Sequence, residues 1–144
     1  MKPLLLAALL ALPLPAFAQD TPSASGARVY FVNLTDGQTV KSPVTVVFGL
    51  SGMGVAPAET IKDNTGHHHL LIDRPAFGEG EYGAEEFTLA VPKDANNVHF
   101  GGGQTETTLE LPPGPHTLQL VLGDHGHVPH VPPVVSEVIT INVE

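Results

Sequence analysis

The stretch ARVYFVNLTDGQTVKSPVTVVFGL, residues 27–50, contains two short runs of β-branched and aromatic residues separated by the turn sequence TDGQ. In the second run Val44, Val46, Phe48 and Leu50 alternate with other residues, so an extended chain would place all four side chains on one face. A period of two residues, bounded by turn residues, is typical of a strand with one buried face. The stretch therefore predicts two β-strands.

The same pattern recurs to the end of the chain. In the run EFTLAV, for example, Phe87, Leu89 and Val91 are expected to face inward. The 15 glycines and 14 prolines interrupt the sequence too often for long helices. We predict an all-β, immunoglobulin-like antiparallel sandwich of about seven strands. The expected strands are 27–34, 43–50, 68–73, 86–91, 105–111, 116–122 and 137–143.

The first residues, MKPLLLAALLALPLPAFAQD, have the features of a secretory signal peptide. We expect residues 1–18 to be removed by cleavage after Ala18, which would leave residues 19–26 as a flexible mature N-terminus and 27–144 as one sandwich domain. The apolar run is short and is broken by two prolines, so no stable membrane insertion is expected. In a bacterium the mature protein would be periplasmic or secreted.

Charge and cysteine content narrow the possible partners. The chain has 15 Asp+Glu against 6 Lys+Arg, and a formal net charge of −9 at pH 7. Such an acidic protein is a poor partner for nucleic acid and for anionic membrane surfaces, and a better one for cations. The chain has no cysteine, which excludes disulfides and thiolate metal ligands.

The eight histidines are the main candidate functional residues, and six of them fall within 67–69 and 125–130. In an immunoglobulin-like sandwich the third and sixth strands are antiparallel neighbours, so the start of one lies beside the end of the other. We therefore expect the two clusters to meet at one pole. The candidate metal ligands are His67, His69, His125, His127, His130 and His99.

Strand alternation sorts these histidines further. If Leu70 and Ile72 face the core, His68 does too, and His67 and His69 share the outer face. If the sixth strand continues past residue 122, the pair at 125 and 127 faces the same side. Neutral imidazoles in such pairs suit zinc, copper or nickel. The predicted cofactor is a copper or zinc ion.

The remaining candidate residues are expected to support the fold or the site without binding the metal. We expect His68 to be a half-buried structural residue, His116 to be structural, and Met53 to be an apolar contact of its loop. Asp73 and Asp124 are candidates for acceptors that orient the ligand rings.

Several motifs together resemble a bacterial family of exported domains of unknown function. They are GHHHLLID (66–73), GQTET (103–107) and LGDHGHVPH (122–130). The resemblance covers about residues 50–142 and implies a small exported domain, with no activity attached. A second, partial resemblance is to cupins, through His67, His69 and Asp73 followed by His116 after PPGP. It implies a jelly roll in which His116 is a fourth ligand, although the spacing of the glycines departs from the cupin pattern.

Three functions follow from these observations. The first is an exported, histidine-rich module that binds copper or zinc. The second is an envelope structural or protein-interaction domain without a metal, whose partner is another envelope protein. The third is a cupin-like metalloenzyme. The sequence contains no convincing Ser–His–Asp arrangement and no paired-carboxylate site, so binding is favoured over catalysis.

Overall fold

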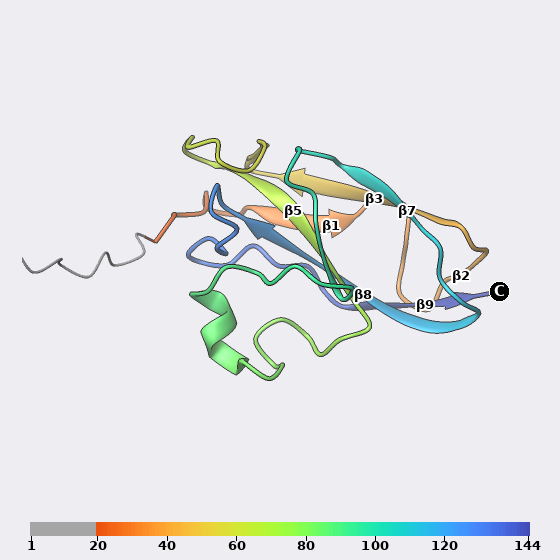
Figure 1. Cartoon of the computed structure of the whole chain (residues 1–144). Coiled ribbons are helices and arrows are strands. Elements are labelled where there is room, and N and C mark those ends of the chain that lie inside the picture. Colours follow the sequence, from red (N-terminus) through yellow and green to blue (C-terminus); the bar gives the residue numbers. More distant parts are fainter. Residues whose placement is uncertain (1–19) are drawn as a thin grey trace, which may run out of the picture.

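The computed structural model describes residues 20–144, and it is an all-β sandwich, as predicted (Figure 1). The signal-peptide prediction for residues 1–18 lies outside the described residues. One sheet has the order β1-β3-β7, with β1 (Arg28–Phe31), β3 (Val44–Ser51) and β7 (Glu106–Leu109). The larger sheet has the order β2-β9-β8-β5-β4, with β2 (Thr39–Val40), β9 (Ile139–Val143), β8 (Gly114–Gly123), β5 (Thr65–Ile72) and β4 (Gly54–Val55), and β6 (Asn97–His99) also pairs with β5.

The pairing of β5 with β8 positions the histidines. These strands, the expected third and sixth, are antiparallel, and their register places His67 opposite Gly123 and Leu70 opposite Leu120. The start of β5 therefore lies beside the end of β8. All the longer pairs are antiparallel, whereas the two-residue strands β2 and β4 pair in parallel with β9 and β5. The longer strands thus form the predicted antiparallel sandwich, with a parallel pair at each of these two edges.

The main core lies between the two sheets. Strand alternation sends every second side chain of β3, β5 and β8 into it, as the sequence predicts. The fully buried apolar members are Val46, Leu70, Leu118, Leu120, Leu122 and Ile141.

The expected strand 86–91 is not formed. Its first residues belong to a 3₁₀ helix, η1 (Gly83–Phe87), and Leu89 is 48% exposed instead of facing inward. The reason is a buried ion pair: Glu86 contacts Arg74 and accepts a hydrogen bond from the N–H of Gly78 at 2.6 Å. These contacts hold the segment in a compact loop. An extended strand could not make both of them. Within residues 20–144 no helix has the length and apolar character needed to span a membrane.

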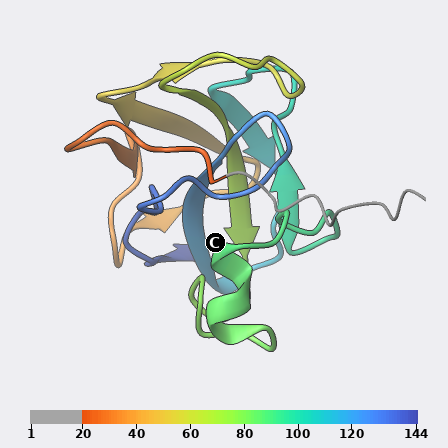
Figure 2. The ribbon, with the colours of Figure 1, turned by 90° about the vertical axis from the view of Figure 1, so that its left-hand side faces the viewer.

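This loop covers the outer face of the larger sheet (Figures 1 and 2). Leu71 and Val121 point away from the main core, and Phe77, Phe87 and Val91 pack over them in a second apolar cluster. The outer face of β5 and β8 is therefore a second interior, and histidines on that face are removed from water.

Candidate metal centre

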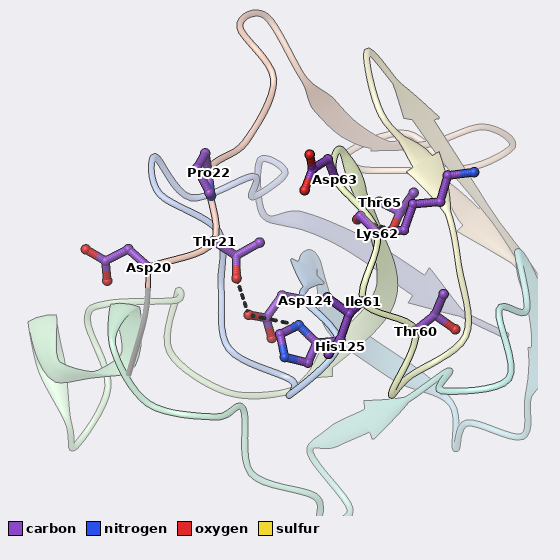
Figure 3. Close-up of a pocket in the computed structure, with 10 residues that line it drawn as sticks. All are labelled: Asp20, Thr21, Pro22, Thr60, Ile61, Lys62, Asp63, Thr65, Asp124 and His125. Carbon is purple, nitrogen blue, oxygen red and sulfur yellow. Dashed lines mark hydrogen bonds and ion pairs between the residues drawn. The ribbon is translucent and has the colours of Figure 1, made fainter. Parts of the chain in front are cut away.

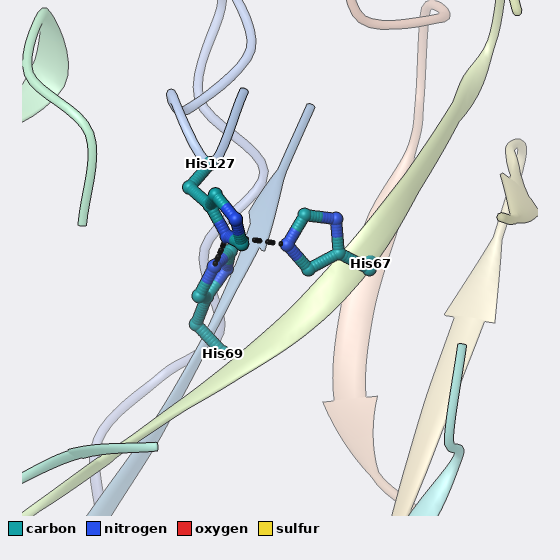
Figure 4. Close-up of side chains that lie close together, drawn as sticks. All are labelled: His67, His69 and His127. Carbon is teal, nitrogen blue, oxygen red and sulfur yellow. Dashed lines mark hydrogen bonds between the residues drawn. The ribbon is translucent and has the colours of Figure 1, made fainter. Parts of the chain in front are cut away.

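Three imidazoles from two distant parts of the chain meet on the outer face of β5 (Figure 4). His67 and His69 project from the strand on the side away from His68, as the alternation predicts, and both are completely buried. His127 comes from the turn after β8. The Nε2 atoms of His67 and His69 lie 2.9 and 3.2 Å from Nδ1 of His127. The group is close enough to hold a metal ion.

Hydrogen bonding alone does not account for this convergence. A neutral imidazole has one N–H and one lone pair, so Nδ1 of His127 forms one directed hydrogen bond, not two. If His67 and His69 both donate to that single lone pair, their own Nδ1 atoms become bare acceptors. Both Nδ1 atoms are buried without a hydrogen-bond partner. A cation at the point of convergence would use one lone pair from each ring, with the protons of His67 and His69 on Nδ1.

The spacing of the nitrogens fits coordination. With metal–nitrogen bonds of about 2.0–2.1 Å, two imidazole nitrogens are about 2.9 Å apart at a right angle and about 3.3 Å apart at the tetrahedral angle. The two short separations, 2.9 and 3.2 Å, lie in this range. Two of the three nitrogen–nitrogen separations thus fit a small transition-metal ion, and all three lie within 4.8 Å.

The environment keeps these rings uncharged. Burial, followed by repulsion from His127 and His99, lowers the pKa of His67 to about 4. Burial and the neighbouring histidines lower the pKa of His69 to about 2. Burial, followed by His99, also lowers the pKa of His127 from its ordinary value. Each ring is therefore neutral at pH 7, which is the state that a metal ligand requires.

The turn that carries His127 is built around one carboxylate. Oδ1 of Asp124 accepts hydrogen bonds from the N–H groups of Gly126 at 2.8 Å and Val128 at 3.0 Å. The N–H of Asp124 donates to the carbonyl of Val128 at 2.8 Å and closes the turn. His127 adopts a left-handed conformation, with φ of 67°, which is uncommon for a residue other than glycine. Asp124 thus shapes the turn instead of bonding to a ligand ring.

His99 lies at the margin of the group. It is directly opposite His69 in the β5–β6 register, and its ring stacks on that of His127 at 4.7 Å between centroids. Its Nε2 donates to the carbonyl of Pro92 at 2.8 Å, which leaves Nδ1 as the lone-pair nitrogen. The structure therefore brings His99 to the site as predicted, as a packing neighbour of the three converging rings.

His125 and His130 do not join the group. Strand β8 ends at Gly123, so the expected extension that would place His125 and His127 on one face does not exist. The side chain of His125 is 41% exposed and lies 3.9 Å from Asp124. His130 is fully buried elsewhere, and its Nε2 lies 3.1 Å from the carbonyl oxygen of Thr65. The turn built on Asp124 is the physical reason, because it ends the strand alternation that would align His125 with His127.

The residues that the cupin resemblance requires are also separated. His116 lies at the start of β8, at the opposite end from the site, and contacts Asp73 at 2.7 Å through Nδ1. Asp73 also accepts from the N–H of Thr117, so it orients His116 and not a candidate ligand. The idea of His116 as a fourth ligand was wrong. Met53 packs against the main core, as expected of an apolar loop contact.

His68 gives a prediction about stability. It faces the main core, is completely buried, lies 5.2 Å from Phe48 between ring centroids, and has no hydrogen-bond partner on either ring nitrogen. A buried polar group without a partner costs about 1–3 kcal/mol. We expect His68→Leu to raise the free energy of unfolding by about 1 kcal/mol in urea titrations at pH 7, with unchanged metal affinity. A loss of stability would show that the ring makes an essential bond.

Gly123 is a residue of the site that the sequence reasoning missed, although it stands in the LGD motif. The ring of His69 lies against it, and a Cβ atom added there would contact Cε1 of His69 and lie 2.9 Å from its Nδ1. We expect Gly123→Ala to displace this ring and weaken zinc binding by at least about tenfold, a cost in the range of about 1–3 kcal/mol for overpacking. Calorimetric titration measures the change.

Gly101→Ala is the matched control, because its Cβ would make only ordinary contacts, 3.4 Å to Ala58 and 3.9 Å to His127. Neither glycine has a φ in the left-handed region, so both tests are steric. Equal affinity of the two variants would contradict the placement of His69.

Comparison with known families agrees with the resemblance seen in the sequence. The family model described as "Domain of unknown function (DUF4399)" matches residues 46–144, which is more than half of the chain. The protein therefore belongs to this family. The match includes the whole of β5, β8 and the turn with His127. No curated protein matches the sequence.

Proposed function

We propose that this member of the family is an exported, histidine-rich module that binds one transition-metal ion, copper or zinc, through His67, His69 and His127. One observation carries the proposal: Nε2 of His67 and Nε2 of His69 converge on Nδ1 of His127, at 2.9 and 3.2 Å. The burial and the neutral state of His67 and His69 support it.

The chemistry of the ligands selects the class of metal. Three imidazoles and no thiolate favour borderline ions, of which Zn(II) and Cu(II) are the usual choices in proteins. Hard ions such as Mg²⁺ and Ca²⁺ prefer oxygen ligands, and the group contains no carboxylate. With three protein ligands, a fourth position is available to water or to a partner's donor group. Such a site suits buffering or delivery of the metal.

Direct metal analysis tests this function. The protein, expressed without an affinity tag and dialysed against Zn(II) or Cu(II), should retain close to one equivalent of metal and gain thermal stability. Ligand binding to the native state alone stabilises a protein by about 2.7 kcal/mol at a ligand concentration of 100 times Kd. Protein that retains no metal and melts at an unchanged temperature would overturn the proposal.

A second candidate, an envelope interaction domain, is favoured by one observation. A cleft of about 360 Å³ beside η1 is lined by apolar side chains, among them Phe77 and Val91. At its edge Tyr82 and Leu89 are 55% and 48% exposed. Exposed apolar side chains around a cleft are typical of a surface that contacts another protein. The metal analysis separates the two functions, since this one requires no ion.

A further inference from the structure

The N-terminal segment reaches the turn that carries His127. The N–H of Val131 donates to the carbonyl of Thr21 at 2.9 Å, and the N–H of Ser23 donates to the carbonyl of Val131 at 3.1 Å. Pro22 and Val131 thereby form a parallel β-bridge. Residues 20–23 therefore lie along the segment that follows the turn, as an additional short strand would.

One side-chain contact connects this segment to the turn itself. The hydroxyl of Thr21 donates to Oδ2 of Asp124 at 2.6 Å, at the edge of a cleft between the N-terminal segment and residues 60–65 (Figure 3). Asp124 is only 5% exposed, and His125 is 3.9 Å from the same oxygen. Thr21 is thus the short, direct donor to the second oxygen of the carboxylate around which the turn is built.

We propose that Thr21 is a positioning residue for the metal ligand His127 and acts through Asp124. The proposal rests on the proposed metal-binding function. Oδ1 of Asp124 holds the N–H groups on both sides of His127, at Gly126 and Val128, and Oδ2 is fixed by Thr21. The side chain of Asp124 is therefore held at both oxygens.

The left-handed backbone of His127 makes this support necessary. Such a conformation costs a non-glycine residue of order 1–3 kcal/mol and persists only where its surroundings impose it. Without the Thr21 hydroxyl the carboxylate can rotate, and the N–H groups that flank His127 lose a fixed acceptor. Nδ1 of His127 would then spend less time at the point where Nε2 of His67 and Nε2 of His69 converge.

Three variants of the full chain test the proposal. Thr21→Val removes the hydroxyl and keeps the shape, Thr21→Ser restores a donor, and Ser23→Ala removes a neighbouring bond, from Ser23 to the carbonyl of Pro132 at 2.8 Å, that does not reach Asp124. Competition with a chromophoric chelator gives the affinity for zinc, and the visible absorption of the Co(II)-loaded protein reports ligand geometry. Melting of the metal-free proteins reports stability.

We expect Thr21→Val to weaken zinc binding by about 10–100-fold, the usual effect of a residue that orients a ligand, and to change the Co(II) spectrum. Thr21→Ser and Ser23→Ala should bind zinc as the parent does. Parent-like affinity and spectrum in Thr21→Val would overturn the proposal. So would equal losses in Thr21→Val and Ser23→Ala that follow their melting temperatures, because that result indicates a purely structural role.

A readout without metal separates this proposal from the proposed function. If the parent protein binds no zinc or cobalt, the proposed function fails and Thr21 has no ligand to position. Amide hydrogen exchange then still measures the turn. Faster exchange of Gly126 and Val128 in Thr21→Val than in Ser23→Ala supports the mechanical link from Thr21 through Asp124 to His127. Equal exchange in the two variants overturns that link.

Discussion

Loss of both histidines of strand β5, in the variant His67→Ala/His69→Ala, is expected to abolish tight binding of zinc and copper. Only His127 would remain of the three converging rings, and a single imidazole does not chelate. Changes that merely reorient a ligand weaken binding by about 10–100-fold, so the loss of two direct ligands should exceed about 1,000-fold. Chelator competition at pH 7 measures this range.

The turn supplies the complementary variant. His127→Asn keeps a side chain that tolerates a left-handed backbone but removes the imidazole, so the fold should persist while zinc affinity falls by more than about 100-fold. His125→Ala is the matched control, because His125 lies outside the group and its side chain is 41% exposed. If His125→Ala lost binding and His127→Asn retained it, the metal would instead lie in the cleft that His125 lines with residues 60–65.

The metal-free protein is expected to lose several kcal/mol of stability between pH 6.5 and pH 4. Burial lowers the pKa of His67 and of His68 to about 4, and lowers the pKa of His69 to about 2. In the unfolded chain these groups titrate near their ordinary pKa of about 6.5. Below that pH the unfolded chain takes up protons that the folded protein does not, so acid favours unfolding.

The size of the effect follows from the same shifts. Each depressed histidine contributes up to about 1.4 kcal/mol per pH unit, so three together reach about 4 kcal/mol per unit in the steepest part of the window. That is comparable with the whole stability of a domain, about 5–15 kcal/mol. One histidine opposes the trend: despite its burial, the hydrogen bond to Asp73 raises the pKa of His116. Its contribution is present below pH 6.5 and is lost as the pH rises.

Urea titrations from pH 7.5 to pH 4 test this prediction. The unfolding midpoint should fall steeply below pH 6.5, and His68→Leu should make the fall shallower by removing one of the three groups. Bound metal should keep His67 and His69 unprotonated and delay the loss to lower pH. A midpoint that stays constant from pH 7 to pH 4.5 would contradict the burial of these neutral histidines.

The parts of the fold that local rules govern could be predicted from the sequence. The alternation of Leu70 and Ile72 with their neighbours correctly separated His68 from His67 and His69, because side chains two apart in a strand share a face. The antiparallel pairing of the third and sixth expected strands followed from the sandwich topology, and it correctly brought 67–69 beside the end of β8.

The errors arose where distant contacts decide the local conformation. The run 86–91 alternates like a strand, yet the ion pair of Glu86 with Arg74 folds its start into η1. The strand alternation expected for His125 and His127 was also wrong. After Gly123 the carboxylate of Asp124 builds a turn, which separates the two side chains. No local pattern shows that the loop over Leu71 and Val121 covers the outer face, so the complete burial of His67 and His69 was not predictable.

X-ray absorption spectroscopy of the untagged protein loaded with one equivalent of zinc is the direct test of metal binding by these three histidines. It reports the number, type and distance of the atoms that surround the ion. We expect three imidazole ligands at about 2.0–2.1 Å, supplied by His67, His69 and His127, and fewer in His127→Asn. A shell of oxygen atoms alone, or an imidazole count that is unchanged in His127→Asn, would contradict it.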